Sequence, residues 1–217
     1  MKMRAFPLPA VCLALVTSSL ISTCWAGVLT FDDILTDYST SNGIVHGTLA
    51  VITNGYQGFN WVNFYIADGP ATASKYGTDG YYYGMVTASN VAFNRGGTPA
   101  EIDSLDANFN FLSAYLTGAW NSNLNIQVQG FSGTNLLYDQ TVVASATSPT
   151  LFTFDYMDID RLYFNSFGGQ NAGFPLGSGT HFVMDNFTFE FVPEPSSLLL
   201  TVAGALLLWP LLKRKRA

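Results

Sequence analysis

The segment Leu124-Asn125-Ile126-Gln127-Val128-Gln129 alternates apolar and amide side chains without interruption. Successive side chains of a β-strand point to opposite faces of its sheet. We therefore expect Leu124, Ile126 and Val128 to face a core while the amides face water, as in an antiparallel sheet with one solvated face.

Strand patterns continue in both directions from this segment. Between residues 27 and 191, short apolar runs are separated by clusters of Gly, Asn, Ser and Pro, and no long window keeps a helical period. Strands are predicted at residues 28–32, 47–52, 61–66, 82–88, 109–116, 123–131, 135–143, 150–156, 159–165 and 181–191. The spacing predicts one all-β domain, a jelly-roll-like antiparallel β-sandwich, with residues 68–81 and 168–179 as loops at one end.

The charge distribution excludes one class of partner. The chain has 217 residues and a formal net charge of −6, but most of its basic residues lie at the two ends. Between residues 27 and 192, 14 acidic side chains stand against three basic ones, a formal charge of −11. Such a domain repels phosphate backbones and anionic lipid headgroups, so we expect no nucleic acid among its partners.

Residues 1–26 have the three parts of a secretory signal peptide. A basic start precedes an apolar run at residues 10–20, and a short polar stretch ends at Ala26. Export through the Sec translocon and cleavage by signal peptidase after Ala26 are predicted. The alternatives are an N-terminal helix of the folded domain and lipid modification of Cys24. Both cysteines, Cys12 and Cys24, lie in this segment, so the exported domain would contain no disulfide.

The C-terminus combines three features in a fixed order. Pro193-Glu194-Pro195 precedes an uncharged segment at residues 196–212, and four basic residues follow at 213–216. As a helix, this segment is about 25 Å long, the short end of the range for spanning a membrane. A transmembrane helix in the inner membrane is therefore predicted, with the basic cluster in the cytoplasm and the acidic domain periplasmic. A buried soluble helix and a Pro-rich linker before an ordinary anchor are the alternatives.

This arrangement resembles the PEP-CTERM sorting signal of Gram-negative, exopolysaccharide-producing bacteria. The resemblance covers residues 192–217 and implies that an exosortase, a membrane cysteine transpeptidase, recognises Pro193, Glu194 and Pro195 and cuts nearby. The anchor would then be discarded and the domain would reach the cell surface or the extracellular matrix. Two prolines keep the motif extended, and Glu194 is the one charge that a recognition site could read.

Aromatic residues make up 15% of the chain, and several lie where turns are expected. Flat rings stack on the apolar face of a sugar while amides and carboxylates bind its hydroxyls. Trp61 and the consecutive Tyr81, Tyr82 and Tyr83 are therefore candidates for binding an extracellular polysaccharide. The alternative is that these rings fill the core, although at least one of three consecutive tyrosines faces outward in a strand.

Acidic residues lie in both terminal strands. Asp32 and Asp33 end the first predicted strand, and Asp185 lies in the last. One face of the last strand is predicted to carry Val183, Asp185, Phe187, Phe189 and Phe191. Terminal strands often pair in jelly rolls, and Ca²⁺ binds six to eight oxygens of the kind that Asp32, Asp33 and Asp185 offer. A structural calcium ion is therefore expected, with ordinary hydrogen bonding at strand ends as the alternative.

The same two segments carry a second resemblance. Phe31-Asp32-Asp33 and Phe182-Val183-Met184-Asp185-Asn186 resemble the terminal strands of carbohydrate-binding-module-like sandwiches. This resemblance also implies a structural calcium ion. No other cofactor is expected.

Little in the sequence indicates catalysis. Asp155, Asp158 and Asp160 lack the glycine and distal glutamate of an EF-hand loop, so a solvated turn is predicted there. His46 and His181 are the only histidines, and no nucleophile elbow or metalloprotease motif occurs. We expect a structural or glycan-binding module. The alternative is a secreted polysaccharide-active hydrolase whose carboxylate pair the spacing does not identify.

Overall fold

The computed structural model describes residues 26–36, 38–40, 43–45 and 48–193. The predicted signal peptide before Ala26, the predicted membrane helix at 196–212 and the basic residues at 213–216 lie outside the described residues. Within the described ranges, no helix is long and apolar enough to cross a membrane.

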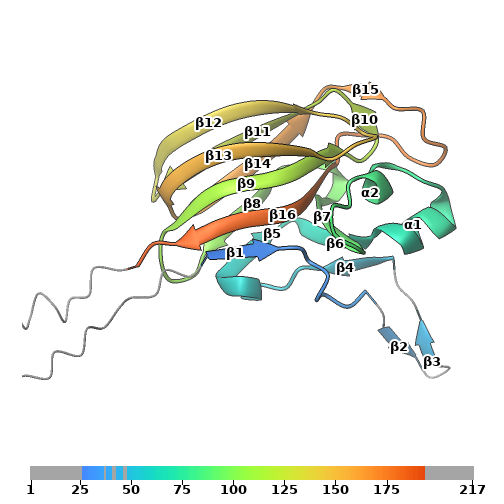
Figure 1. Cartoon of the computed structure of the whole chain (residues 1–217), viewed down its shortest axis with the longest axis horizontal. Coiled ribbons are helices and arrows are strands. Elements are labelled where there is room, and N and C mark those ends of the chain that lie inside the picture. Colours follow the sequence, from blue (N-terminus) through green and yellow to red (C-terminus); the bar gives the residue numbers. More distant parts are fainter. Residues whose placement is uncertain (1–25, 37, 41–42, 46–47, 194–217) are drawn as a thin grey trace, which may run out of the picture.

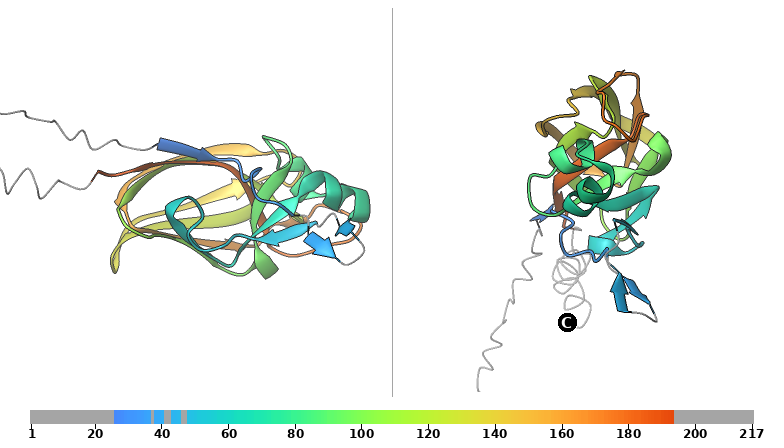
Figure 2. Two further views of the ribbon diagram at one scale, coloured as in Figure 1. Left: turned by 90° about the horizontal axis from the view of Figure 1, so that it is seen from below. Right: turned by 90° about the vertical axis from the view of Figure 1, so that its right-hand side faces the viewer.

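Two antiparallel sheets form a sandwich (Figures 1 and 2). The first consists of β1 (Ala26–Leu29), β4 (Leu49–Val51), β6 (Phe64–Asp68), β7 (Asn90–Asn94), β9 (Phe109–Gly118), β13 (Thr150–Ile159) and β16 (Phe182–Phe191). Its order is β13-β9-β16-β7-β6-β4, with β1 also paired to β16. The second consists of β5 (Phe59–Val62), β8 (Ala100–Ser104), β11 (Leu124–Ser132), β12 (Asn135–Ala144) and β14 (Arg161–Phe167), in the order β12-β11-β14-β8-β5. The predicted all-β sandwich is confirmed.

Smaller elements complete the fold. They are the ribbons β2 (Tyr38–Thr40) with β3 (Gly43–Val45) and β10 (Asn121–Ser122) with β15 (Gln170–Asn171), the helices α1 (Gly69–Tyr76) and α2 (Gly80–Tyr83), and the 3₁₀ turns η1 (Tyr56–Gly58) and η2 (Arg95–Gly97). The terminal strands pair as expected, because Ala26 lies opposite Glu190 and Leu29 opposite Phe187.

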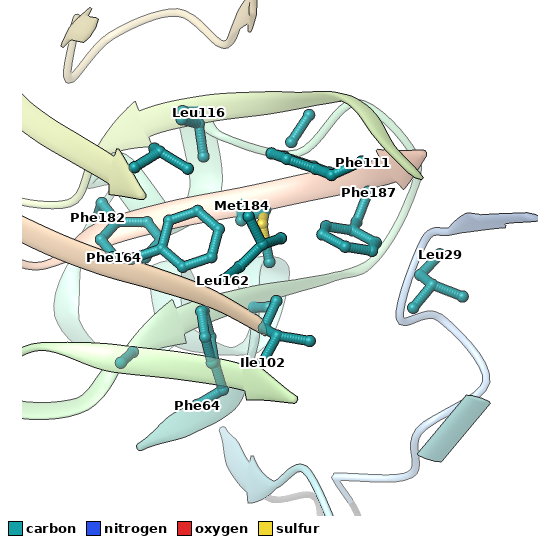
Figure 3. Packing of buried hydrophobic residues seen from close by; sticks show 14 of the residues in the cluster. Leu29, Phe64, Ile102, Phe111, Leu116, Leu162, Phe164, Phe182, Met184 and Phe187 are labelled. Atoms are coloured by element: carbon teal, nitrogen blue, oxygen red, sulfur yellow. The ribbon is translucent and has the colours of Figure 1, made fainter. Parts of the chain in front are cut away.

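The core lies between the two sheets and is rich in phenylalanine. Leu124, Ile126 and Val128 are fully buried in it, as their alternation predicts. Phe64, Phe164 and Phe182 meet with ring centroids 5.5 to 5.9 Å apart (Figure 3). Burying one such side chain stabilises a fold by about 1.5–3 kcal/mol.

A β-bulge in β16 corrects the predicted face of the last strand. Asp185 lies opposite Tyr115, but Thr188 lies opposite Ser113, so β16 has one extra residue here, and Asn186 has a φ of 50°. The bulge reverses which side chains face the core. Val183 consequently packs in a second cluster outside the sandwich, while Phe187 packs in the main core. Asp185 does not begin the aromatic row.

Two of the three clustered aspartates also lie in bulges. Thr153, Tyr156 and Ile159 of β13 pair with alternate residues of β9, which leaves one extra residue in each interval. Asp155 and Asp158 have φ values of 50° and 58°, a region that aspartate tolerates better than most residues. The predicted turn is therefore wrong for these two residues, while Asp160 lies between β13 and β14 and accepts a hydrogen bond from the Gly133 N–H.

Helices replace the predicted loop at 68–81 and the start of the predicted strand at 82–88. The Asp68 carboxylate accepts from the Ala71 N–H at 2.7 Å, and Pro70 lies in the first turn of α1. The Asp79 carboxylate accepts from the Tyr81 and Tyr82 N–H groups and caps α2. These are ordinary N-terminal helix signals.

The two predicted end loops do meet at one end of the sandwich. A Cβ at Gly77 would lie 3.6 Å from Pro175 Cγ, so the two segments are in contact, and the ring of Phe174 stacks on Tyr83 just beyond the first of them. Helix α2 packs on the outer face of the seven-stranded sheet, where Tyr81, Val91, Phe93 and Val183 belong to the second cluster.

Candidate functional site: an aromatic pocket beside the helices

A cavity of about 540 Å³ opens at the helix-bearing end of the sandwich. Its walls come from β4, β6 and β7, from α1 and α2, and from the segment that leads into β16. This volume lies within the range of ordinary small-ligand sites.

Aromatic rings form most of one wall. Tyr81 meets Phe93 edge-to-face at 5.0 Å and Trp120 at 5.5 Å. Burial and the charge of Asp79 raise the pKa of the Tyr81 hydroxyl, while the neighbouring Trp120 side chain lowers it. Tyr65 and Tyr76 add two further rings to the lining. A cavity with this wall offers flat apolar surfaces to a ligand.

Three buried polar atoms in the lining residues have no hydrogen-bond partner in the described part of the chain. They are Thr72 Oγ1, Asp79 Oδ2 and His181 Nδ1. Burial raises the pKa of the Asp79 carboxyl, although its N–H donors oppose the rise, and burial lowers the pKa of His181. The imidazole is therefore neutral at pH 7, with one nitrogen able to donate and the other able to accept.

The positively charged side chain of Arg95 lies at the edge of the cavity. Arg95 Nη1 donates to the Tyr65 hydroxyl at 3.1 Å, and its guanidinium carbon lies 5.0 Å from the centroid of the Tyr65 ring. Arg95 is exposed, whereas Asp79 is buried.

The four predicted sugar-binding residues occupy different environments. Trp61 is only 4% exposed and packs edge-to-face against Phe31 and Phe64 in the main core, which is the alternative given above for these rings. Tyr81 lines the pocket. Tyr82 is 39% exposed outside the lining, and Tyr83 stacks on Phe174. The helical turn of α2 separates the three side chains, whereas a strand would alternate them.

The predicted calcium ligands do not form one cluster. Asp32 accepts from the Asn90 N–H at 2.9 Å, and Asp33 accepts from the Tyr56 hydroxyl at 2.6 Å. Asp185 accepts backbone N–H groups from the segment before β7. Among the described residues, no group of three His, Cys, Asp or Glu side chains is arranged to hold a metal ion. Asp32 and Asp185 lie near enough for the charge of Asp32 to raise the pKa of Asp185, but protein donors already pair with each of the three carboxylates. The structural calcium ion therefore stays a prediction that this geometry does not support.

The remaining predicted sites lie at the ends of the described chain. Ala26 is the first residue of β1, and Pro193 is exposed just after β16. Glu194, Pro195 and His46 lie outside the described residues.

Sequence reasoning missed most of the pocket. Thr72, Asp79, Arg95, Trp120 and His181 are scattered over more than a hundred positions and share no motif. One local signal was available: Asp68-Gly69-Pro70 is a typical start of a helix. This signal would have predicted a helix just before Tyr81, Tyr82 and Tyr83.

Comparison with protein-family models and with curated proteins finds no match. Among solved structures, a DUF4465 family protein from Bacteroides caccae is 12% identical, with a TM-score of 0.50 over 76% of this chain and 98% of its own. A DUF4465 family protein from Bacteroides ovatus is 13% identical, with a TM-score of 0.43 over 77% and 99%. TmCBM61 in complex with β-1,4-galactotriose is 8% identical, with a TM-score of 0.29 over 67% and 94%. The similarity to the first of these supports the β-sandwich fold alone.

Proposed function

We propose that this protein is an exported glycan-binding protein that holds a sugar residue in the aromatic pocket. The observation that carries the proposal is the set of unpartnered atoms on Thr72, Asp79 and His181 beside aromatic walls. An unsatisfied buried polar group costs about 1–3 kcal/mol, so a ligand that pairs with these atoms gains affinity.

A sugar matches this arrangement chemically. Its hydroxyls can donate to Asp79 Oδ2 and can donate to or accept from Thr72 Oγ1 and His181 Nδ1. Its C–H face can lie on the rings of Tyr81 or Trp120, which are apolar over a wide area. A purely apolar ligand would leave the three atoms unpaired.

Sorting through the C-terminal signal is the second part of the proposal. The tail from Pro193 onward would hold the domain at the inner membrane until an exosortase released it to the cell surface or matrix. Its support is the order of the motif, the uncharged segment and the basic cluster in the sequence.

Binding is preferred to hydrolysis for a specific reason. Among the residues that line the cavity in the described chain, Asp79 is the one carboxylate. Glycosidases ordinarily need two carboxyl groups on opposite sides of the scissile bond.

The test uses two tyrosines of nearly equal exposure. Tyr76 is 40% exposed and lines the cavity, whereas Tyr82 is 39% exposed and does not. Full-length protein in a detergent without a sugar headgroup is run on affinity gels containing β-glucan, galactan, mannan, xylan or alginate. We expect at least one polysaccharide to retard the parent, and Tyr76→Ala to weaken that binding about three- to tenfold through the lost stacking surface.

Tyr82→Ala is the matched control and should migrate like the parent. Retardation lost in Tyr82→Ala but kept in Tyr76→Ala would move the binding surface away from the pocket. A parent protein that none of these polysaccharides retards would contradict glycan binding itself.

A further inference from the structure

We propose that the pocket selects an acidic sugar, a uronate whose carboxylate pairs with Arg95 while its hydroxyls meet the unpartnered polar atoms. This inference rests on the proposed function, because it specifies the class of sugar that the same pocket takes.

The backbone of Arg95 is held firmly at the cavity edge. Its N–H donates to the Asn63 carbonyl at 3.1 Å, and its carbonyl accepts from Asn63 Nδ2 at 3.1 Å. The next residue, Gly96, also lines the cavity and has a φ of 70°, a conformation that favours glycine. The position of Arg95 is therefore set by the turn rather than by a mobile loop tip.

The guanidinium is oriented but carries no ion pair. Its contacts in the described chain are the hydroxyl and the ring face of Tyr65, and no described carboxylate lies within ion-pair distance. A guanidinium has five N–H donors in a planar fork, which matches a carboxylate in a bidentate pair. One hydrogen bond to Tyr65 leaves donors for a ligand.

Asp79 is the one carboxylate among the described residues that line the cavity, and one of its two oxygens already has partners. Asp79 Oδ1 accepts from the Tyr81 and Tyr82 N–H groups at the start of α2, at 3.0 and 3.3 Å. Asp79 is 2% exposed, so it lies inside the cavity wall, whereas Arg95 lies at the exposed edge. In the proposed complex, a hydroxyl of the sugar therefore binds Asp79, and the carboxylate of the sugar binds Arg95.

The acidic character of the whole domain does not prevent this contact. At 0.15 M salt, charges more than about 8 Å apart are largely screened, so distant acidic residues repel a uronate weakly. A direct bidentate pair is not removed by this screening. Arg95 would therefore admit a carboxylate at one point of a surface that otherwise disfavours anions.

The test compares each acidic oligosaccharide with its carboxyl-reduced counterpart, in which CH₂OH replaces the carboxylate and every linkage is unchanged. Trimers of galacturonate, mannuronate and guluronate and a hyaluronan tetramer are titrated calorimetrically into the full-length protein at 0.15 M salt. We expect at least one acidic member to bind about tenfold or more tightly than its reduced form, the gain of a charge-assisted contact.

Three variants locate the effect. Arg95→Gln should bind the acidic and reduced forms with about equal affinity, and Arg95→Lys should restore part of the preference. Arg161→Gln makes the same charge change on β14, where Arg161 lies over the Phe131 ring and outside the cavity lining, so it should keep the preference.

The outcomes separate this inference from the proposed function. Equal binding of the acidic and reduced forms, or a preference that survives in Arg95→Gln, would overturn the uronate inference and leave glycan binding in place. Failure of both the acidic and the reduced forms, together with every neutral polysaccharide above, would overturn both.

Discussion

Asparagine and aspartate account for five of the seven residues other than glycine that have a positive φ in the described chain, and all five lie within or directly between strands. Asn63, Asn123, Asp155, Asp158 and Asn186 all have positive φ values. These two residue types are enriched several-fold in this region because their short polar side chains can hydrogen-bond locally. Many of the polar residues in this acidic chain therefore shape the backbone rather than bind a ligand.

Asp185 is the clearest example at the residue scale. It is fully buried, and its carboxylate accepts from the N–H groups of Val86, Thr87 and Asn186 at 2.7 to 3.0 Å. Burial raises the pKa of Asp185, although these donors oppose the rise. Through these hydrogen bonds, the Asp185 carboxylate links the segment that contains Val86 and Thr87 to the bulge of β16.

We predict that Asp185→Ala lowers the free energy of unfolding by about 2–4 kcal/mol, because buried N–H groups lose their acceptor. Urea denaturation of the parent and variant measures the change.

The parent protein should melt at the same temperature in EDTA and in millimolar Ca²⁺, because no group of three described His, Cys, Asp or Glu side chains is arranged to hold a metal ion. A rise in melting temperature with Ca²⁺ that Asp185→Ala abolishes would restore the calcium hypothesis.

At the scale of elements, α2 is a short helix fitted closely to the sheet. The Gly80 N–H donates to the Ala119 carbonyl at 3.0 Å, and a Cβ at Gly80 would lie 2.0 Å from the Gly118 carbonyl oxygen. Because that neighbour is backbone, it cannot move aside cheaply. Gly80 thus permits the approach that places Asp79 and Tyr81 in the pocket wall.

We predict that Gly80→Ala displaces α2, lowers the free energy of unfolding by about 1–3 kcal/mol and weakens glycan binding. Thermal melting and affinity gels measure the two effects. Gly133→Ala is the control, because its φ of 57° carries a local cost of about 1 kcal/mol but no atom lies within 4 Å of the added Cβ. Gly133→Ala should leave binding unchanged, and equal loss of binding in both variants would refute the role of α2.

At the scale of the whole molecule, α1 and α2, which contribute to the pocket lining, lie at one end of the sandwich, and the start of β1 and the end of β16 lie toward the other (Figure 1). His181 lines the pocket immediately before β16, and Pro193 follows the other end of β16. Ten residues of strand span about 30 Å, so β16 separates the pocket from the point where the tail leaves. A domain tethered by its C-terminus would present the pocket away from the membrane.

We predict that this orientation is measurable in vesicles containing the full chain with Cys12 and Cys24 replaced by serine. A fluorophore on Asp106→Cys, close to the Val192–Asn108 hydrogen bond, should be quenched by nitroxide lipids. The same fluorophore on Ser74→Cys in α1 should not be quenched, because α1 lies at the pocket end. The reverse pattern would place the pocket against the membrane.

Processing of the tail is a separate prediction. In cells that contain an exosortase, mass spectrometry of the extracellular protein should find no peptide that includes residues 213–216. Glu194→Ala should leave the full-length chain in the membrane, because the substitution removes the single charge of the motif. Extracellular protein that retains Leu212 would refute cleavage.

The folded domain should lose stability as the pH rises from about 4 through the raised pKa values of three aspartates. Burial raises the pKa values of Asp79, Asp103 and Asp185 above those of the unfolded chain. Their contribution is fully present below the unfolded pKa of about 4 and is lost as the pH rises through the folded values. His181 acts in the opposite direction, since its lowered pKa removes stability as the pH falls below about 6.5. Melting curves from pH 4 to pH 8 at constant ionic strength test this, and a melting temperature that climbs steadily over that whole range would contradict it.

The local sequence pattern was sufficient to predict those features of this protein that depend only on residues close together in the chain. The alternation at 124–129 determines which side chains of β11 are buried, because a strand has a period of two wherever it lies. The turn residues between apolar runs determine that the fold is an antiparallel sandwich, and the composition of the chain ends carries the predicted addressing signals.

Tertiary contacts decided the rest. The face of Val183 and Phe187 depends on a bulge whose position is set by the pairing of β16 with β9, and no local period contains that information. Trp61 is a core residue because Phe31 and Phe64 surround it, although its sequence neighbours suit a turn equally well. The pocket exists only because folding brings α1, α2 and η2 beside the start of β16, which joins groups as distant in sequence as Thr72 and His181. Such a site is defined by distances in space, and these follow from the packing of the sheets rather than from any single segment.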